Sequence, residues 1–156
     1  MARNNAYALL RERPRSEAEI RRRLAMKGYG PGIADAVVSG LRGEGLVDDA
    51  KFARLWIESR MHSNPAGDVV LRHELKEKGV GDAVIEAALG EKAARFDECA
   101  IAAGIAKERF ARMKKIERPK AMKRVYDFLV RRGFGFDTVR RAIEACREDG
   151  RTCNGI

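Results

Sequence analysis

Residues 16–28, with the sequence SEAEIRRRLAMKG, contain the pattern that decides the fold. Ile20 and Leu24 lie eight and four residues before Gly28, so both fall on one face of a helix. A glycine at this position can take the left-handed conformation that ends a helix, and Lys27 before it complements the negative end of the helix dipole. The stretch therefore predicts an amphipathic helix that ends at Gly28.

The same pattern occurs twice more along the chain. Gly79 and Gly133 each follow apolar residues at the same two offsets and a basic residue directly before the glycine. These residues are Leu71, Leu75 and Lys78 in the second copy, and Val125, Leu129 and Arg132 in the third. The glycines are separated by 51 and 54 residues, and recurrence at a nearly fixed spacing indicates a repeat protein.

In each copy the glycine separates a second helix from a third. Ser16 and Glu19 form a capping box at the start of the second helix, and Pro31 suits the first turn of the third. The first helices are expected at residues 5–12, 49–61 and 92–115, the last as one continuous helix. The apolar stripes expected to be buried include Ile33, Val37 and Leu41, then Phe52, Leu55, Trp56 and Ile57, and finally Met122, Val125, Tyr126 and Leu129.

Alternating β patterns of useful length do not occur, so we expect nine helices. We predict an all-α protein of three tandem three-helix repeats in an elongated, curved array. The repeats are expected at residues 1–44, 45–90 and 91–148, followed by a flexible C-terminal tail at residues 149–156.

Charge and composition favour an anionic partner. Lys and Arg number 32 against 23 Asp and Glu, which gives a formal net charge of +9 and a pI of about 9.8. Such a balance suits nucleic acid, acidic lipid or an acidic protein. No apolar run reaches the ~18 residues of a membrane span and no signal peptide is recognisable, so we expect a cytoplasmic protein without membrane association.

Metal and cofactor chemistry is not indicated. Cys99, Cys146 and Cys153 are odd in number and lack metal-ligand spacing, so we interpret them as reduced thiols. His62 and His73 do not share a helical face at i and i+4, which argues against a zinc site. We therefore predict no metal and no cofactor.

Two strings resemble those of a known family. Residues 15–20, RSEAEI, followed by Leu24 and Lys27-Gly28, resemble the first-unit signature of the RecX family of RecA regulators. Residues 45–53, GLVDDAKFA, resemble that family's central aspartate pair and Phe-Ala motif. The resemblance continues through Gly67, Leu71, Glu74-Leu75 and Lys78-Gly79, and extends from about Ala6 to Ile143. The third unit lacks the capping box and the aspartate motif.

The resemblance implies a function. Members of the family are modular helical proteins that bind the RecA filament on single-stranded DNA, lie along its groove, and reduce its ATPase and strand-exchange activities. Some also bind DNA directly. On this resemblance we expect a non-enzymatic, monomeric regulator of RecA in DNA repair and recombination, with RecA-type filaments as its partner and direct DNA contact as a further property.

Several residues allow both a structural and a functional interpretation. Asp48 and Asp49 could act as an acid–base pair or as metal ligands, but Asp48 is better explained as a helix cap and Asp49 as a first-turn anion. Phe52 and Trp56 could stack on bases, but their spacing is more typical of a core. The structural motif residues are therefore Ser16, Glu19, Gly28, Asp48, Asp49, Phe52, Gly79 and Gly133.

Two basic runs are the candidate binding sites. Residues 107–141 contain 13 Lys and Arg against four acids, a net charge of +9 that equals that of the whole chain. A second run surrounds the capping box near the N-terminus. The candidate partner- or nucleic-acid-binding residues are Arg11, Arg13, Arg15, Arg21 and Arg22, together with Lys114, Lys115, Lys120, Lys123, Arg124, Arg131 and Arg132. A purely solvated charged face is the structural alternative.

Three hypotheses of different classes follow. The first is a protein that binds and inhibits a recombinase filament through a concave basic surface. The second is a stand-alone DNA-binding helical module whose affinity comes from phosphate contacts. The third, an enzyme, lacks a nucleophile, a base and an orienting partner at workable spacing, so we predict no catalytic residues.

Overall fold

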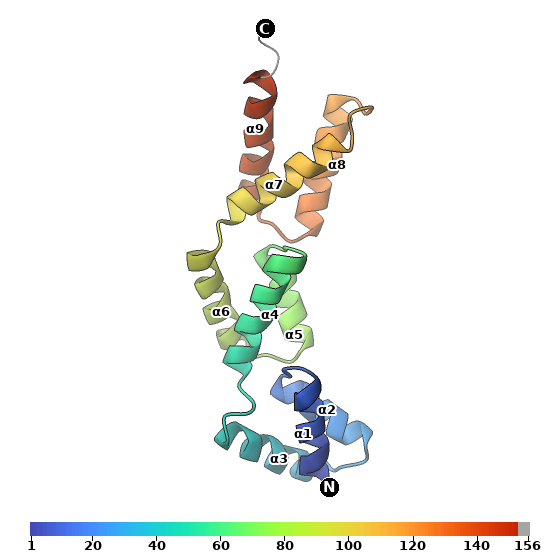
Figure 1. Ribbon diagram of the computed structural model, residues 1–156, viewed down its shortest axis with the longest axis vertical. Helices are drawn as coiled ribbons and strands as arrows, with labels where there is room; N and C mark the ends of the chain where they lie inside the picture. The colour runs from blue at the N-terminus through green and yellow to red at the C-terminus, as the bar shows by residue number, and fades with distance from the viewer. Residues whose placement is uncertain (153–156) are drawn as a thin grey trace. The chain divides into compact units, whose positions relative to one another are not determined.

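Within residues 1–152, whose backbone the structure describes, the computed structural model contains nine α-helices and no strand (Figure 1). Side chains are described for residues 1–147. In chain order the helices are α1 (Ala2–Glu12), α2 (Glu17–Met26), α3 (Pro31–Gly43), α4 (Asp49–Ser63), α5 (Asp68–Glu77), α6 (Asp82–Arg95), α7 (Glu98–Ala111), α8 (Arg118–Arg131) and α9 (Phe136–Thr152). The all-α fold of three three-helix repeats is therefore confirmed.

Two compact units make up the described chain. Unit 1 contains residues 1–59 and 72–90, and unit 2 contains residues 60–71 and the described residues from Glu91 onward. The helices of the second repeat, α4, α5 and α6, therefore contribute residues to both units.

The cores of the first and third repeats consist mainly of small and branched aliphatic side chains. In unit 1 the buried cluster from α1 to α3 and the segment after α3 contains Ala6, Ile20, Leu24, Ala34, Val38, Leu41 and Val47. In unit 2 the cluster from α7 to α9 contains Ala102, Ala106, Val125, Leu129, Phe134, Val139, Ala142 and Ile143. Short side chains let the helices approach closely, which explains how a chain with few aromatic residues forms stable cores.

All three repeat glycines end their helices in the left-handed conformation. Gly28, Gly79 and Gly133 have φ angles of 84°, 77° and 83°. At the first of them, the Gly28 amide donates to the Ala25 carbonyl at 2.9 Å, and the Tyr29 amide donates to the Leu24 carbonyl at 3.1 Å. The same pair of bonds recurs at Gly79 and Gly133. It is the Schellman motif, which satisfies the last carbonyls of a helix.

One predicted helix is wrong. The structure divides residues 92–115 between the end of α6 and α7, and the chain then turns at residues 112–116. The physical reason is Asp97, whose extended backbone interrupts the helix and whose side chain accepts a hydrogen bond from the Ala100 amide at 3.0 Å as the N-cap of α7. The expected boundary between the second and third repeats, at residues 90 and 91, lies inside α6.

Three side chains expected in buried stripes are exposed. Ile33, Leu55 and Tyr126 keep 52%, 41% and 36% of their surface accessible. On α3 the buried face shifts by one residue to Ala34 and Val38, because the small Ala34 can face the other helices closely. Of the expected tail, residues 149–152 belong to α9, and residues 153–156 lie outside the described part of the chain.

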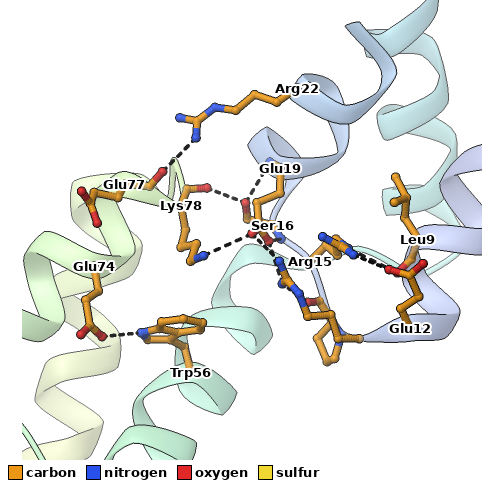
Figure 2. Close-up of polar contacts among 12 residues, drawn as sticks. Leu9, Glu12, Arg15, Ser16, Glu19, Arg22, Trp56, Glu74, Glu77 and Lys78 are labelled. Carbon is orange, nitrogen blue, oxygen red and sulfur yellow. Dashed lines mark hydrogen bonds and ion pairs between the residues drawn. The ribbon is translucent and has the colours of Figure 1, made fainter. Parts of the chain in front are cut away.

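In unit 1, the start of α2 packs on the end of α5. The Ser16 hydroxyl donates to the Lys78 carbonyl at 2.5 Å, and Arg22 donates to the Glu77 carbonyl at 3.0 Å (Figure 2). A Cβ added to Gly79 would lie 2.3 Å from the Cβ of Ala18. Glycine is therefore needed here both for its φ angle and for this close approach.

In unit 2, the start of α5 packs on the end of α8 in the same register. The Gly67 amide donates to the Arg132 carbonyl at 2.9 Å, and the Val69 amide donates to the Gly133 carbonyl at 3.4 Å. A Cβ on Gly133 would lie 2.6 Å from the backbone nitrogen of Val70. The glycine that ends a second helix therefore also receives the start of the second helix of the preceding repeat.

Alanine substitutions at the three glycines should separate these two roles. A Cβ at Gly28 would have no atom within 4 Å, so Gly28→Ala should cost only the about 1–2 kcal/mol of a left-handed L-residue. Gly79→Ala and Gly133→Ala should cost about 1–3 kcal/mol more, because the added methyl group collides with a neighbouring helix start. Urea unfolding followed by far-UV circular dichroism measures the difference. Equal losses at all three positions would contradict the packing role.

Candidate functional site

The N-terminal basic residues are largely engaged within the fold. Arg13 donates to both carboxylate oxygens of Glu19, at 2.8 and 3.1 Å, and Arg21 pairs with Asp35 at 2.8 Å. Hydrogen bonds to Glu19 and to Asp35 raise the pKa of Arg13 and of Arg21, respectively, above the ordinary value. Arg22 donates to the Glu77 carbonyl, and Arg11 is exposed. Three of them, Arg13, Arg21 and Arg22, therefore hold α2 in place.

Arg15 does not lie on the exposed basic surface that the sequence suggested. It is 7% exposed, pairs with Glu12 at 2.6 Å and donates to the Leu9 carbonyl at 3.3 Å (Figure 2). Its position directly before the N-cap Ser16 directs it inward, where its aliphatic stem packs and its guanidinium satisfies the end of α1. Its role is therefore structural.

The aspartate pair serves two helix starts. Asp48 caps α4 by accepting hydrogen bonds from the Ala50 and Lys51 amides at 2.8 and 3.0 Å. Asp49 reaches back to α2 and accepts from the Glu17 amide at 2.9 Å. Burial raises the pKa of Asp49, and this outweighs the hydrogen bond, which lowers it. Neither carboxylate belongs to a group of three or more potential metal ligands in the described residues.

Basic residues of the third repeat, by contrast, face solvent. The side chains of Lys114 and Lys115, in the turn after α7, and of Lys120, Lys123 and Arg124 on α8 are exposed, as is Arg131. Lys120 pairs with Glu117 at 3.0 Å, whereas the other five make no hydrogen bond or ion pair with a described residue. We call these six residues the third-repeat basic surface.

Arg132 differs from the rest of this run. Burial lowers its pKa, and the nearby charges of Arg60 and Arg109 lower it further. Its guanidinium lies 5.2 Å from the centre of the Phe128 ring, where Arg109 also stacks at 3.4 Å, and it donates to Asn64. Arg132 is therefore held inside unit 2 rather than presented on its surface.

A groove of about 930 Å³ lies between α8 and α9 in unit 2. Phe136, 69% exposed, and Tyr126 stand in its lining. The charged residues of the lining are Arg118, Lys123, Arg140, Arg147, Asp137 and Glu144. Exposed rings beside cationic groups can contact the bases and phosphates of a nucleic acid or the side chains of an acidic peptide.

Phe136, Tyr126, Arg118, Arg140 and Arg147 were not identified as candidates from the sequence. The sequence Phe134-Gly135-Phe136 could have indicated the exposed ring. An apolar residue directly follows the glycine in all three repeats, and Phe134 fills that position, so Phe136 is an additional phenylalanine. Phe134 is buried, and the second phenylalanine is left on the surface.

Trp56 and His62 also have structural partners. Trp56 donates to Glu74 at 2.9 Å and lies under the Lys78 ammonium at 4.8 Å (Figure 2). His62 packs edge-on against Phe96, and Cys99 and Cys146 are free thiols.

Among the described helices, none combines the length and apolar character that crossing a bilayer requires.

Known proteins share this arrangement. Family models for the RecX first, second and third three-helix domains match residues 2–41, 48–89 and 97–143. The regulatory protein RecX of Halorhodospira halophila is 35% identical over 147 residues, covering 94% of this chain and 89% of that protein. That of Amycolatopsis mediterranei is 32% identical over 133 residues, covering 85% and 75%.

Two solved structures have the same fold. A crystal structure of regulatory protein RecX matches with a TM-score of 0.82 and 21% identity, over 92% of this chain and 71% of the other. The crystal structure of RecX from Lactobacillus salivarius matches with a TM-score of 0.82 and 18% identity, over 92% and 93%. The helices thus define an all-helical protein of three tandem three-helix domains. The three domain matches and the similarity to the relatives show, in addition, that the chain belongs to the RecX family of regulatory proteins.

Substitution should distinguish the buried arginine from the exposed lysine. Arg15→Ala should lower the free energy of unfolding by about 1–3 kcal/mol, because it removes packing and leaves a helix-end carbonyl without its donor. Lys123→Ala should change it by less than about 0.5 kcal/mol. Urea denaturation checks both, and equal effects would show that Arg15 is not structural.

The Asp49 carboxyl gives a pH-dependent prediction. Since its pKa is raised in the folded chain, its stabilising contribution is present below its ordinary pKa and is lost as pH rises through the folded value. Asp49→Asn keeps an acceptor for the Glu17 amide and has no charge to bury. Its free energy of unfolding should therefore increase relative to that of the wild type as pH rises above about 4. Asp49→Ala should cost about 1–2 kcal/mol at neutral pH. Unfolding free energies measured from pH 3 to 8 test this, and a gain that grows toward low pH would contradict it.

Proposed function

We propose that this protein binds the RecA filament on single-stranded DNA and mainly inhibits its ATPase and recombinase activities in DNA repair and recombination. The observation that carries the proposal is the match of all three RecX domain models, in order, along the chain. The relatives are named regulatory proteins, which is consistent with control of another protein's activity rather than catalysis.

The third-repeat basic surface is the proposed contact. Five of its six cations are unpaired with described residues, so they can meet carboxylates or phosphates without first breaking an ion pair. Charges at an interface rim accelerate association and select the partner more than they add affinity. A chain that binds one state of the filament better than another shifts the filament toward that state, which is how binding alone can regulate turnover.

Further properties belong to the same proposal. The chain acts as a cytoplasmic monomer without metal or cofactor, and it is not an enzyme. Asp48 and Asp49, the adjacent carboxylates that could form an acid–base pair, accept hydrogen bonds from amides at helix starts. Because these carboxylates serve the fold, they support a role in binding rather than in catalysis.

A titration into RecA-catalysed ATP hydrolysis on single-stranded DNA tests the proposal. The protein should lower the rate at amounts well below one chain per recombinase protomer. Joint reversal of Lys120, Lys123 and Arg124 to Glu should raise the concentration needed for half inhibition by on the order of tenfold, because three exposed contacts change sign. Helicity should stay unchanged. An unaffected ATPase rate with bound protein present would rule out the proposed function.

A matched variant controls for net charge. Joint reversal of Lys51, Arg54 and Lys76 to Glu removes the same charge from exposed positions in unit 1 and should change half inhibition by less than about threefold. Equal losses in both variants would show that overall charge, not this surface, matters.

The runner-up is a DNA-binding helical module, favoured by the exposed rings in the α8–α9 groove. It requires substantial affinity for DNA without recombinase and a steep loss with added salt. The same two triple variants, assayed at two salt concentrations on DNA alone, separate it from filament binding.

A further inference from the structure

The two contacts between second helices follow one rule. A glycine acceptor site is defined here as the carbonyl of a helix-ending basic residue together with the positive-φ glycine after it. In unit 1 the site is Lys78–Gly79 and receives the N-cap Ser16, and in unit 2 it is Arg132–Gly133 and receives the N-cap Gly67. In both cases the N-cap residue lies 12 positions before the glycine of its own repeat.

The incoming helix starts share their chemistry. Each has a small N-cap residue, Ser16 or Gly67, that allows backbone-level approach. Each also has an acidic first turn, with Glu17 and Glu19 in α2 and Asp68 in α5. In unit 1 Glu19 lies 3.5 Å from the Lys78 ammonium of the acceptor site, whereas in unit 2 Asp68 pairs with Lys92 at 2.6 Å. The positive end of one helix dipole thereby meets the negative end of another. The matching partner is a helix start with a small cap and an acidic first turn.

The first repeat has an acceptor site that no described residue occupies. At Lys27–Gly28 the glycine has the same φ, a Cβ there would meet nothing within 4 Å, and the Lys27 carbonyl accepts no hydrogen bond from the described residues. Its surroundings combine exposed apolar and cationic side chains: Met26 and Ile33 are 78% and 52% exposed, and the Lys27 ammonium donates to Asn5 at 3.2 Å. The residues at the Met26 position in the other two repeats are Glu77 and Arg131, so the unoccupied site alone carries an exposed methionine there.

A further copy of this chain does not offer the matching second-helix start. The starts of α2 and α5 are engaged in their own chain. In the third repeat the position 12 residues before Gly133 is Ala121, which lies inside α8 because that helix begins about one turn earlier, at Arg118. The first turn of α8 contains no acid. No second-helix start of a further copy is therefore available to the site. The starts of α6 and α9 also combine a glycine N-cap with an aspartate in the first turn, and the crosslink described below distinguishes them from a helix of the recombinase.

We propose that Lys27–Gly28, with Met26 and Ile33, binds the start of a helix on the recombinase, one with a small N-cap residue and an acidic first turn. The cap donates to the Lys27 carbonyl, its backbone packs on Gly28, and the acid approaches Lys27 and the exposed Arg23. Met26 and Ile33 are covered in the complex. The inference rests on the proposed function, because that function supplies the partner.

Opposite charges at one position give a sign test. Affinity for RecA filaments on single-stranded DNA is measured for the full chain carrying Met26→Glu or Met26→Lys. An acidic partner turn should make Met26→Glu at least about fivefold weaker, with Met26→Lys within about twofold of wild type or tighter. Leu46→Glu and Leu46→Lys, at a half-exposed position after α3, are the matched controls and should differ by less than about twofold. Both sites are exposed, so the free energy of unfolding should change by no more than the about 0.3–1 kcal/mol that a charge near a helix end contributes.

A crosslink identifies the occupant directly. A benzoylphenylalanine placed at position 26 and irradiated on the filament should react within the first turn of a recombinase helix. Reaction elsewhere on the recombinase, or with another copy of this chain, overturns the inference, as do equal affinities of Met26→Glu and Met26→Lys. If these affinities are equal but wild type still binds and inhibits, the proposed function stands alone. If wild type does not bind the filament, both fail.

Discussion

One kind of hydrogen bond joins successive second helices: the N-cap residue of one helix, through the Ser16 hydroxyl or the Gly67 amide, donates to the last carbonyl before a left-handed glycine. At this carbonyl a helix would otherwise leave an unsatisfied acceptor, so the contact completes one helix end while it positions another. Gly79 and Gly133 make it feasible, since a side chain at either would collide with Ala18 or Val70. The local rule that ends each helix and the tertiary rule that joins the repeats therefore depend on the same residue.

Helix ends were predictable because their signals are local. The capping box at Ser16 and the glycine stops combine residue types whose preferences hold almost independently of context. The break at Asp97 was missed because the apolar spacing continues across it and hides a cap. The exposure of Tyr126 and Ile33 could not be read from spacing either, since it depends on which of two adjacent faces packs more closely against other helices.

For the candidate binding residues, too, one part could be predicted from the sequence and another depends on the fold. A run of positive charge marks a segment in the sequence, but whether that charge is available depends on acids that the fold brings near. In the first repeat three arginines form ion pairs: Arg13 with Glu19, Arg21 with Asp35, and Arg15 with Glu12. In the third repeat, neither Lys123 nor Arg124 has such a partner among the described residues. Two similar runs therefore differ in their surroundings: the first stabilises helix starts through ion pairs, and the second is exposed to solvent.

The added turn at the start of α8 also bears on how such a chain can grow. A gene duplication that placed another repeat before the first would find Gly28 open and a helix end ready to receive it. Placing one after the third would first require shortening α8 by about one turn, because Ala121 lies where the cap should be. The fold is thus extensible in one direction and closed in the other.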